Sequence, residues 1–159
     1  LAKSLHAPVI TGMLKGLRGT TLHHFCCDHF PCPTTSVTFE AGRHEDPLST
    51  RRSIAALINL LRSVGCVHSD DVENRHDDIL MDYSKGLPKV AELIEVHPVK
   101  KEDLFQMEPG FKNFQPIQKG QLLAKDKNGP IYAGYDCHIL MPLYQHQGED
   151  GFFLIQVIE

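Results

Sequence analysis

A glutamate at position 40 lies where an apolar strand is expected to meet a turn and then a helix. In the segment VTFEAGRHEDP, residues 37–47, the apolar Val37 and Phe39 alternate with polar neighbours, which predicts a strand over residues 36–41. Glu40 would then project from the opposite face of that strand's carboxyl end. Ligands of open α/β sheets collect outside such strand ends, so a carboxylate there suits general base catalysis. The same pattern also fits an ordinary loop with a solvated glutamate.

The residues after Glu40 predict how the chain turns into a helix. Gly42 permits a tight turn, Asp46 can cap a helix, and Pro47 fits the first helical position. A helix is predicted over residues 47–64, with Gly65 ending it. Its apolar stripe consists of Ile54, Leu57, Ile58, Leu61 and Val64.

Earlier residues predict further parts of a layered sheet. A short buried strand is expected over residues 7–13, and a helix over 19–30 that ends at Pro31 and Pro33. Together with the strand at 36–41 and the helix at 47–64, these form the alternation typical of an α/β fold. Residues 1–66 are therefore expected to be the carboxyl-terminal part of an α/β catalytic domain.

The second half of the chain differs from the first in composition and residue pattern. Residues 67–88 are polar and acidic and are predicted as a solvated linker or the start of an exposed helix. Residues 89–159 contain short apolar runs separated by glycines, which predicts a β-rich barrel or sandwich domain. Its hairpins are similar to those of lipoyl-type domains, but residues 126–128 match a carrier-lysine tip only in part.

A second group of chemically capable residues lies at positions 23–32. His23, His24 and His29 stand among Cys26, Cys27 and Cys32, and His24 and Cys27 have an offset usable for zinc. A zinc site needs a second ligand pair, and no clear partner pair occurs elsewhere. The odd total of five cysteines favours free thiols in a reducing cytosol.

Composition limits the classes of function. The chain has 159 residues, 42% of them hydrophobic, with a net charge of −4 and a mean hydropathy of −0.22. These values are typical of a globular domain, and the chain has no cluster of positive charge that would bind nucleic acid. No apolar run reaches the roughly 20 residues of a membrane helix. We therefore expect neither a nucleic-acid partner nor a membrane.

Two blocks resemble one enzyme family. The segment FEAGRHEDP, residues 39–47, followed by an amphipathic helix, resembles the catalytic-glutamate segment of the succinylglutamate desuccinylase and aspartoacylase family, which is related to zinc carboxypeptidases. The segment ILMPLYQHQGEDGFF, residues 139–153, and PGFKNF, residues 109–114, resemble its carboxyl-terminal part. The resemblance implies a carboxypeptidase-like α/β/α sheet followed by a small β-rich domain.

The resemblance also implies an activity and its residues. Family members cleave the amide bond of an N-acyl amino acid or similar small amide, and Glu40 matches their general base. Tyr144 matches a tyrosine near the substrate carboxylate, and Arg43 could face an anionic substrate, although many relatives have glutamine there. Family members bind zinc through residues that precede the matched segments, so the ligands are expected upstream of Leu1. His146 and Glu149 match the family's zinc motif only in spacing.

On this interpretation the chain is the carboxyl-terminal piece of a longer cytoplasmic enzyme, and the isolated piece is inactive. Its partners would be a small amide substrate and the remainder of the same polypeptide. Two alternatives stay open. The chain could be a noncatalytic binding or regulatory module in which Glu40 is structural, or an independent metal-binding protein that uses the histidine and cysteine cluster.

Overall fold

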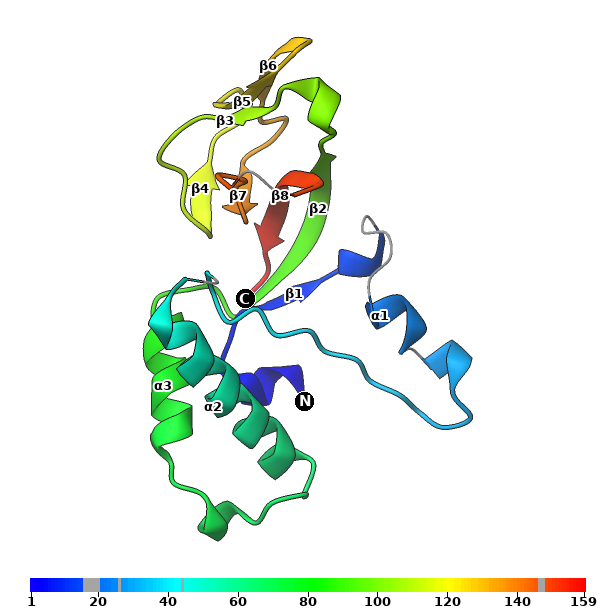
Figure 1. Ribbon diagram of the computed structural model, residues 1–159, viewed down its shortest axis with the longest axis vertical. Helices are drawn as coiled ribbons and strands as arrows, with labels where there is room; N and C mark the ends of the chain where they lie inside the picture. Colours follow the sequence, from blue (N-terminus) through cyan, green and yellow to red (C-terminus); the bar gives the residue numbers. More distant parts are fainter. Residues whose placement is uncertain (16–20, 26, 44, 146–147) are drawn as a thin grey trace. The chain divides into compact units, whose positions relative to one another are not determined.

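The helices and sheets of this chain belong to two different units (Figure 1). The computed structural model describes residues 1–15, 21–25, 27–43, 45–145 and 148–159, without the side chains of Lys15 and Cys27. The first unit comprises Leu1–Val9 and Gly19–Lys89, and the second comprises Ile10–Arg18 and Val90–Glu159. Each unit has hydrophobic clusters made of its own residues.

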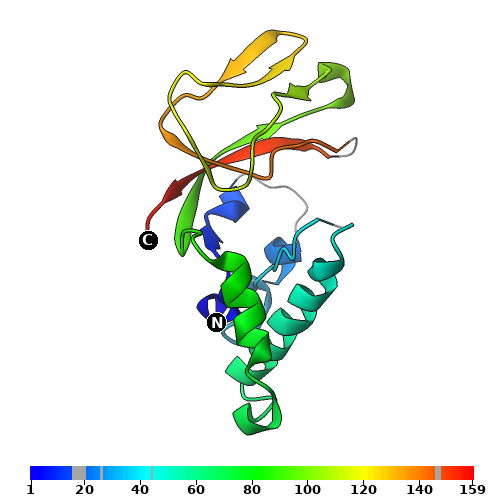
Figure 2. The same ribbon diagram turned by 90° about the vertical axis from the view of Figure 1, so that its left-hand side faces the viewer.

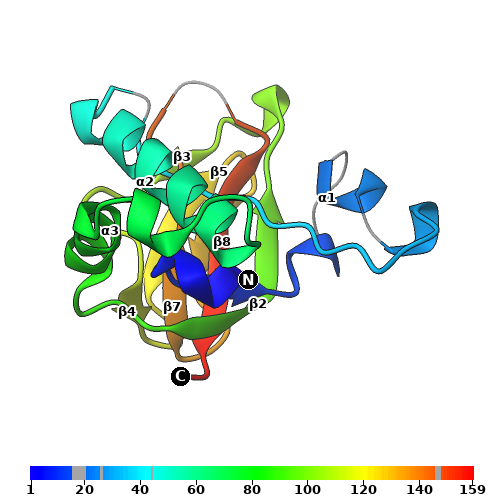
Figure 3. The same ribbon diagram turned by 90° about the horizontal axis from the view of Figure 1, so that it is seen from below.

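Two helices form the centre of the first unit. Helices α2 (Pro47–Ser63) and α3 (Arg75–Ser84) pack side by side (Figure 2), and the 3-10 helix Ala2–Leu5 lies against α2 (Figure 3). Their shared core consists of Leu5, Ala55, Ala56 and Leu80, surrounded by Phe39, Leu60 and Ile79. The unit also contains α1 (Thr21–His24) and the short 3-10 helices Cys27–His29 and Ser69–Asp71.

Helix α2 confirms the helix predicted at residues 47–64. Asp46 occupies the N-cap position and accepts a hydrogen bond from the Leu48 backbone N–H at 2.9 Å, and Pro47 is the first helical residue. Val64 is the C-cap, and Gly65 follows with a φ of 75°, a conformation that glycine adopts without strain. The local signals alone therefore define both ends of this helix.

Helix α2 buries polar and small residues and exposes apolar ones, which is the reverse of what its amphipathic pattern predicts. Arg52, Ala55, Ala56 and Asn59 are buried. On the opposite face, Ile54, Leu57 and Val64 are 50%, 56% and 53% exposed. Ile58 and Leu61, the other two members of the predicted apolar stripe, are half-buried, so the stripe forms the more exposed side of the helix. Within the first unit, α2 packs through its small and polar residues.

The predicted strand over residues 36–41 is not formed, and this prediction is wrong. Residues 33–41 have no regular secondary structure. A strand needs a neighbour to pair with its backbone, whereas here the Ala41 carbonyl accepts its hydrogen bond from the Arg52 side chain. Phe39 packs onto the helical core instead of onto a sheet. The described part of residues 1–66 therefore contains no layered α/β sheet, and its one strand is β1 (Val9–Thr11).

Two further element predictions differ from the structure. The helix expected over residues 19–30 appears as α1 and the 3-10 helix Cys27–His29, and Phe25 next to α1 is 50% exposed. Short helices without an apolar surface to pack against do not propagate. Residues 67–88, predicted as a solvated linker or the start of an exposed helix, contain the helix α3, which is not merely exposed because it buries His76 and Leu80. Leu80 packs in the core of the unit, so burial stabilises this polar segment as a helix.

The second unit contains two β-sheets. The five-stranded sheet has the order β1-β2-β8-β7-β4, and the three-stranded sheet has the order β3-β5-β6. The strands are β2 (Val90–Pro98), β3 (Gln106–Met107), β4 (Gln115–Ile117), β5 (Leu122–Asp126), β6 (Gly129–Tyr132), β7 (Cys137–Leu140) and β8 (Asp150–Val157). The central pair is β2 with β8, in which Leu93 lies opposite Ile155.

Residues of both sheets share one hydrophobic core. Met107 and Leu123 come from the three-stranded sheet or its edge, and Ile139, Phe152 and Leu154 come from the larger sheet. The β-rich character predicted from residue 89 is confirmed, and the chain combines helices with sheets in which most strand pairs are antiparallel. Across the described ranges, no helix is both long enough and apolar enough to cross a membrane.

Gly151 in β8 gives a direct test of this core. A Cβ at Gly151 would lie 2.7 Å from the Phe105 ring, which is tilted against the rings of His97 and Phe152. We expect Gly151→Ala to lower the free energy of unfolding by about 1–3 kcal/mol through overpacking, measured by urea denaturation. The control is Gly134→Ala, because nothing lies within 4 Å of a Cβ at Gly134. Equal stabilities of the two variants would contradict this packing.

Candidate functional site

Glu40 is an exposed residue between two anchored neighbours. Phe39 packs against the core formed by the two long helices and the first 3-10 helix. The Ala41 carbonyl accepts a hydrogen bond from Arg52 Nη1 at 3.2 Å. Glu40 itself is exposed and has no hydrogen-bond or ion-pair partner among the described residues. The backbone on either side is therefore held, while the carboxylate is free to meet a ligand.

Arg52 is the residue that binds this turn to the helices. It lies on the buried face of α2, with only 8% of its surface exposed. Its Nη1 donates to Asp46 Oδ2 at 2.7 Å as well as to Ala41, and its Cζ lies 3.6 Å from the centre of the Tyr83 ring on α3. One guanidinium therefore contacts the turn, its cap residue and both helices.

Gly42 is required at the position where the turn passes Arg52. Its φ is 115°, and a Cβ there would lie 3.0 Å from Arg52 Nη1 and 3.3 Å from the Tyr83 hydroxyl. A side chain at this position would be strained by the backbone and crowded by both neighbours. The predicted role of Gly42 in turning the backbone is confirmed, and its close approach to Arg52 adds a second reason.

The end of the turn is closed by Asp46 and Ser49. Ser49 Oγ donates to the carbonyls of Arg43 and Asp46, both at 2.6 Å. The hydrogen bond from the Leu48 N–H, followed by that from Arg52, lowers the pKa of Asp46 below its ordinary value. Asp46 is thus an anion that stabilises the helix start and pairs with Arg52. Its role in capping is confirmed.

The remaining residues proposed for substrate binding have different surroundings. Arg43 is exposed in the turn, three residues from Glu40. His44, the next residue in the sequence, lies outside the described residues. Tyr144 belongs to the second unit, where its hydroxyl donates to the Glu108 carbonyl at 2.7 Å and accepts from the Phe111 N–H at 2.8 Å. These two backbone bonds engage the Tyr144 hydroxyl in joining loops of its own unit.

No group of three or more potential ligands that could hold a metal ion occurs among the described residues. In the histidine and cysteine cluster, His24 stacks with His29, and Cys32 is an exposed free thiol. Cys26 and the side chain of Cys27 lie outside the described residues, as does His146 of the late His-x-x-Glu spacing. The described residues of the cluster therefore supply no metal site by themselves.

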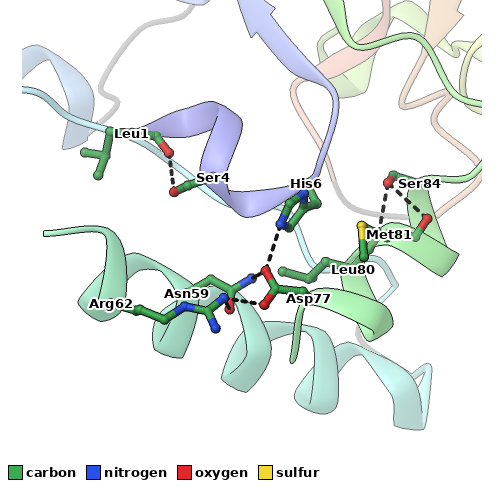
Figure 4. Close-up of polar contacts among 9 residues, drawn as sticks. All are labelled: Leu1, Ser4, His6, Asn59, Arg62, Asp77, Leu80, Met81 and Ser84. Carbon is green, nitrogen blue, oxygen red and sulfur yellow. Dashed lines mark hydrogen bonds and ion pairs between the residues drawn. The ribbon is translucent and has the colours of Figure 1, made fainter. Parts of the chain in front are cut away.

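A second polar cluster is centred on Asp77 (Figure 4). Sequence reasoning did not find it. Asp77 accepts hydrogen bonds from His6 Nε2 at 2.8 Å, from Asn59 Nδ2 at 3.1 Å and from Arg62. Burial by itself would raise the pKa of Asp77, but the hydrogen bonds from Arg62 and His6 outweigh it and lower the pKa overall. The cluster thus ties the segment after the first 3-10 helix to α2 and α3.

The geometry of the Asp77 cluster favours a structural role. A histidine held by an aspartate supplies two of the three members of a catalytic triad, which also needs a nucleophile beside the histidine. The hydroxyl nearest in sequence is that of Ser4, and it donates to the Leu1 carbonyl at 2.7 Å. One signal could have found both polar clusters: Arg52, Asn59 and Arg62 fall on one face of α2 at helical offsets.

The lowered pKa of Asp77 predicts a pH dependence of stability. A lowered pKa stabilises the fold fully above the unfolded value near pH 4, and the contribution disappears as the pH falls through the folded value. We expect Asp77→Asn to lower the free energy of unfolding at pH 7 by about 1–3 kcal/mol and to flatten its decline below about pH 4. Denaturant titrations at several pH values measure both effects. The control is Asp78→Asn, an exposed residue of the same helical turn. An unchanged acid decline in Asp77→Asn would contradict the assignment.

No protein-family model matches the chain, and no curated protein matches it.

Proposed function

We propose that the chain is the carboxyl-terminal portion of a zinc-dependent hydrolase that cleaves the amide bond of an N-acyl amino acid or a similar small amide. One observation carries the proposal: Glu40 is exposed between Phe39, which is packed in a core, and Ala41, whose carbonyl is held by Arg52. A general base must be both accessible and fixed in place. The position of Glu40 in the segment that resembles the family's catalytic glutamate supports the same role.

In this proposal, the chain contributes proton transfer by Glu40 to the reaction. When bound, zinc would lower the pKa of a coordinated water and polarise the amide carbonyl. The Glu40 carboxylate accepts a proton from the attacking water and passes it to the nitrogen of the departing amine. Arg43, exposed in the same turn, can pair with the carboxylate of an N-acyl amino acid.

We assign both the zinc ligands and a carboxypeptidase-like sheet to the polypeptide upstream of Leu1. The exposed apolar face of α2 supports this assignment. Ile54, Leu57 and Val64 are about half exposed, and a helix that covers a sheet needs such a stripe. The proposal therefore includes the remainder of the same polypeptide as the partner that covers this face.

Substitution of Glu40 tests the proposal. In the polypeptide that joins these residues to their upstream sequence, Glu40→Gln should lower kcat for amide hydrolysis by roughly 10² to 10⁴, because the amide cannot accept a proton. The assay measures release of free amine from a panel of N-acyl amino acids. Zinc content should stay at the wild-type level, because Glu40 is not assigned as a ligand.

The matched control is Glu45→Gln, an exposed glutamate in the same turn. It removes the same charge five residues away and should leave kcat unchanged. If Glu40→Gln hydrolyses the panel as fast as the wild type, Glu40 is not the base, and the view of the chain as a noncatalytic module gains support.

Metal analysis of residues 1–159 separates the hydrolase fragment from an independent metal-binding protein. We expect less than stoichiometric zinc after dialysis, because the proposed hydrolase has its zinc ligands in the polypeptide upstream of Leu1. The measurement is elemental analysis of the isolated chain. Stoichiometric zinc that is lost on replacing His24, Cys26 and Cys27 would contradict this expectation and favour the histidine and cysteine cluster.

A further inference from the structure

We infer that Arg52 is a positioning residue for Glu40: it holds the turn that carries the general base and does not itself touch the reacting atoms. This inference rests on the function proposed above. It concerns a residue that neither the Glu40 segment nor the resemblance singles out.

The contacts of Arg52 converge on the turn from two helices. The side chain comes from α2, stacks on Tyr83 of α3, and donates to Asp46 Oδ2 and to the Ala41 carbonyl. Gly42 passes so close that a Cβ there would lie 3.0 Å from Arg52 Nη1. The turn is therefore shaped around the guanidinium group.

Arginine suits this position better than lysine does. Its planar group can stack on an aromatic ring and donate in fixed directions at the same time. A lysine ammonium keeps the charge near Asp46, but it lacks the planar face that Tyr83 contacts. Arg52→Lys should therefore keep the ion pair and loosen the hold on the Ala41 carbonyl.

The connection to Glu40 is short. Ala41 is the next residue, so the orientation of its peptide group limits where the Glu40 carboxylate can point. Phe39 restrains the other side through its packing. With the Ala41 anchor removed, the next hydrogen bond that holds the turn on the downstream side is at the Arg43 carbonyl, which accepts from Ser49 Oγ at 2.6 Å. A displacement of about 1 Å at a catalytic group can cost roughly 100-fold in rate.

A merely stabilising arginine would behave differently. Buried ion pairs are weak evidence for stability, because desolvation offsets much of their attraction. If Arg52 only stabilised the fold, its loss would lower the amount of folded protein and leave the rate per folded molecule unchanged. If Arg52 positions Glu40, its loss lowers that rate in a way that depends on Glu40.

The test is a double-mutant cycle in the polypeptide that joins these residues to their upstream sequence. Arg52→Lys and Arg52→Ala are each combined with Glu40→Gln, and kcat and KM for N-acyl amino acid hydrolysis are measured per folded molecule. Alone, the Arg52 variants should lower kcat by roughly 10- to 100-fold with KM unchanged. In the Glu40→Gln background, they should lower the residual rate no further.

The control substitution is Arg51→Ala, which removes an exposed arginine from the preceding position of the same helix. It should leave both constants at their wild-type values. Hydrogen exchange of the amides at positions 41–43 supplies a readout that needs no activity: exchange should accelerate in Arg52→Lys and not in Arg51→Ala. If Arg52→Ala fails to fold, Arg52→Lys carries the cycle.

The outcomes separate this inference from the function on which it rests. Hydrolysis that needs Glu40 but proceeds at the wild-type rate in Arg52→Lys would overturn the positioning role alone. Multiplying losses in the double variants would also overturn it, because they indicate a role independent of Glu40. Absence of hydrolysis by the wild-type protein would remove the proposed function, and the positioning role with it, even if exchange at positions 41–43 accelerates.

Discussion

The burial of one positive charge organises the helical unit. The guanidinium of Arg52 is removed from water, and an unpaired buried charge costs several kcal/mol. Asp46, the Ala41 carbonyl and the Tyr83 ring meet this cost together. None of them can move far without leaving the charge unsatisfied, so the turn, the start of α2 and the α3 helix are restrained by a single side chain.

Further buried polar contacts join α2 to α3. Asn59 and Arg62 follow Arg52 on one face of the helix, and both donate to Asp77 of α3. The contact between the helices therefore has a polar link at each end, with Ala55, Ala56 and Leu80 between them. Small side chains let the backbones approach, while the polar links define which residues face each other. A purely apolar contact would specify that alignment less strictly.

Sequence patterns predicted what local chemistry decides. The cap by Asp46, Pro47 at the first helical position and the end of α2 near Gly65 depend on residues within one turn of each other, and all are confirmed. The strand at residues 36–41 depended on a neighbour that the sequence does not place, and it did not form. Arg52 was missed because the periodicity rule assigns the apolar face of a helix to the interior. That rule fails where polar groups satisfy each other inside.

Because α2 buries its polar face, its apolar face is left exposed. Ile54, Leu57 and Val64 each leave about half of their surface in water. Covering them would contribute roughly 1 kcal/mol apiece, on a scale of about 1.5–3 kcal/mol for a fully buried aliphatic side chain. That gain is a sizeable fraction of the stability of a small unit, which is typically about 5–15 kcal/mol. Under the proposed function, the remainder of the polypeptide supplies this cover. The polar face that holds Glu40 and the apolar face that binds the remainder would then be two sides of one helix. A substitution on either side would affect the site through the same rigid element.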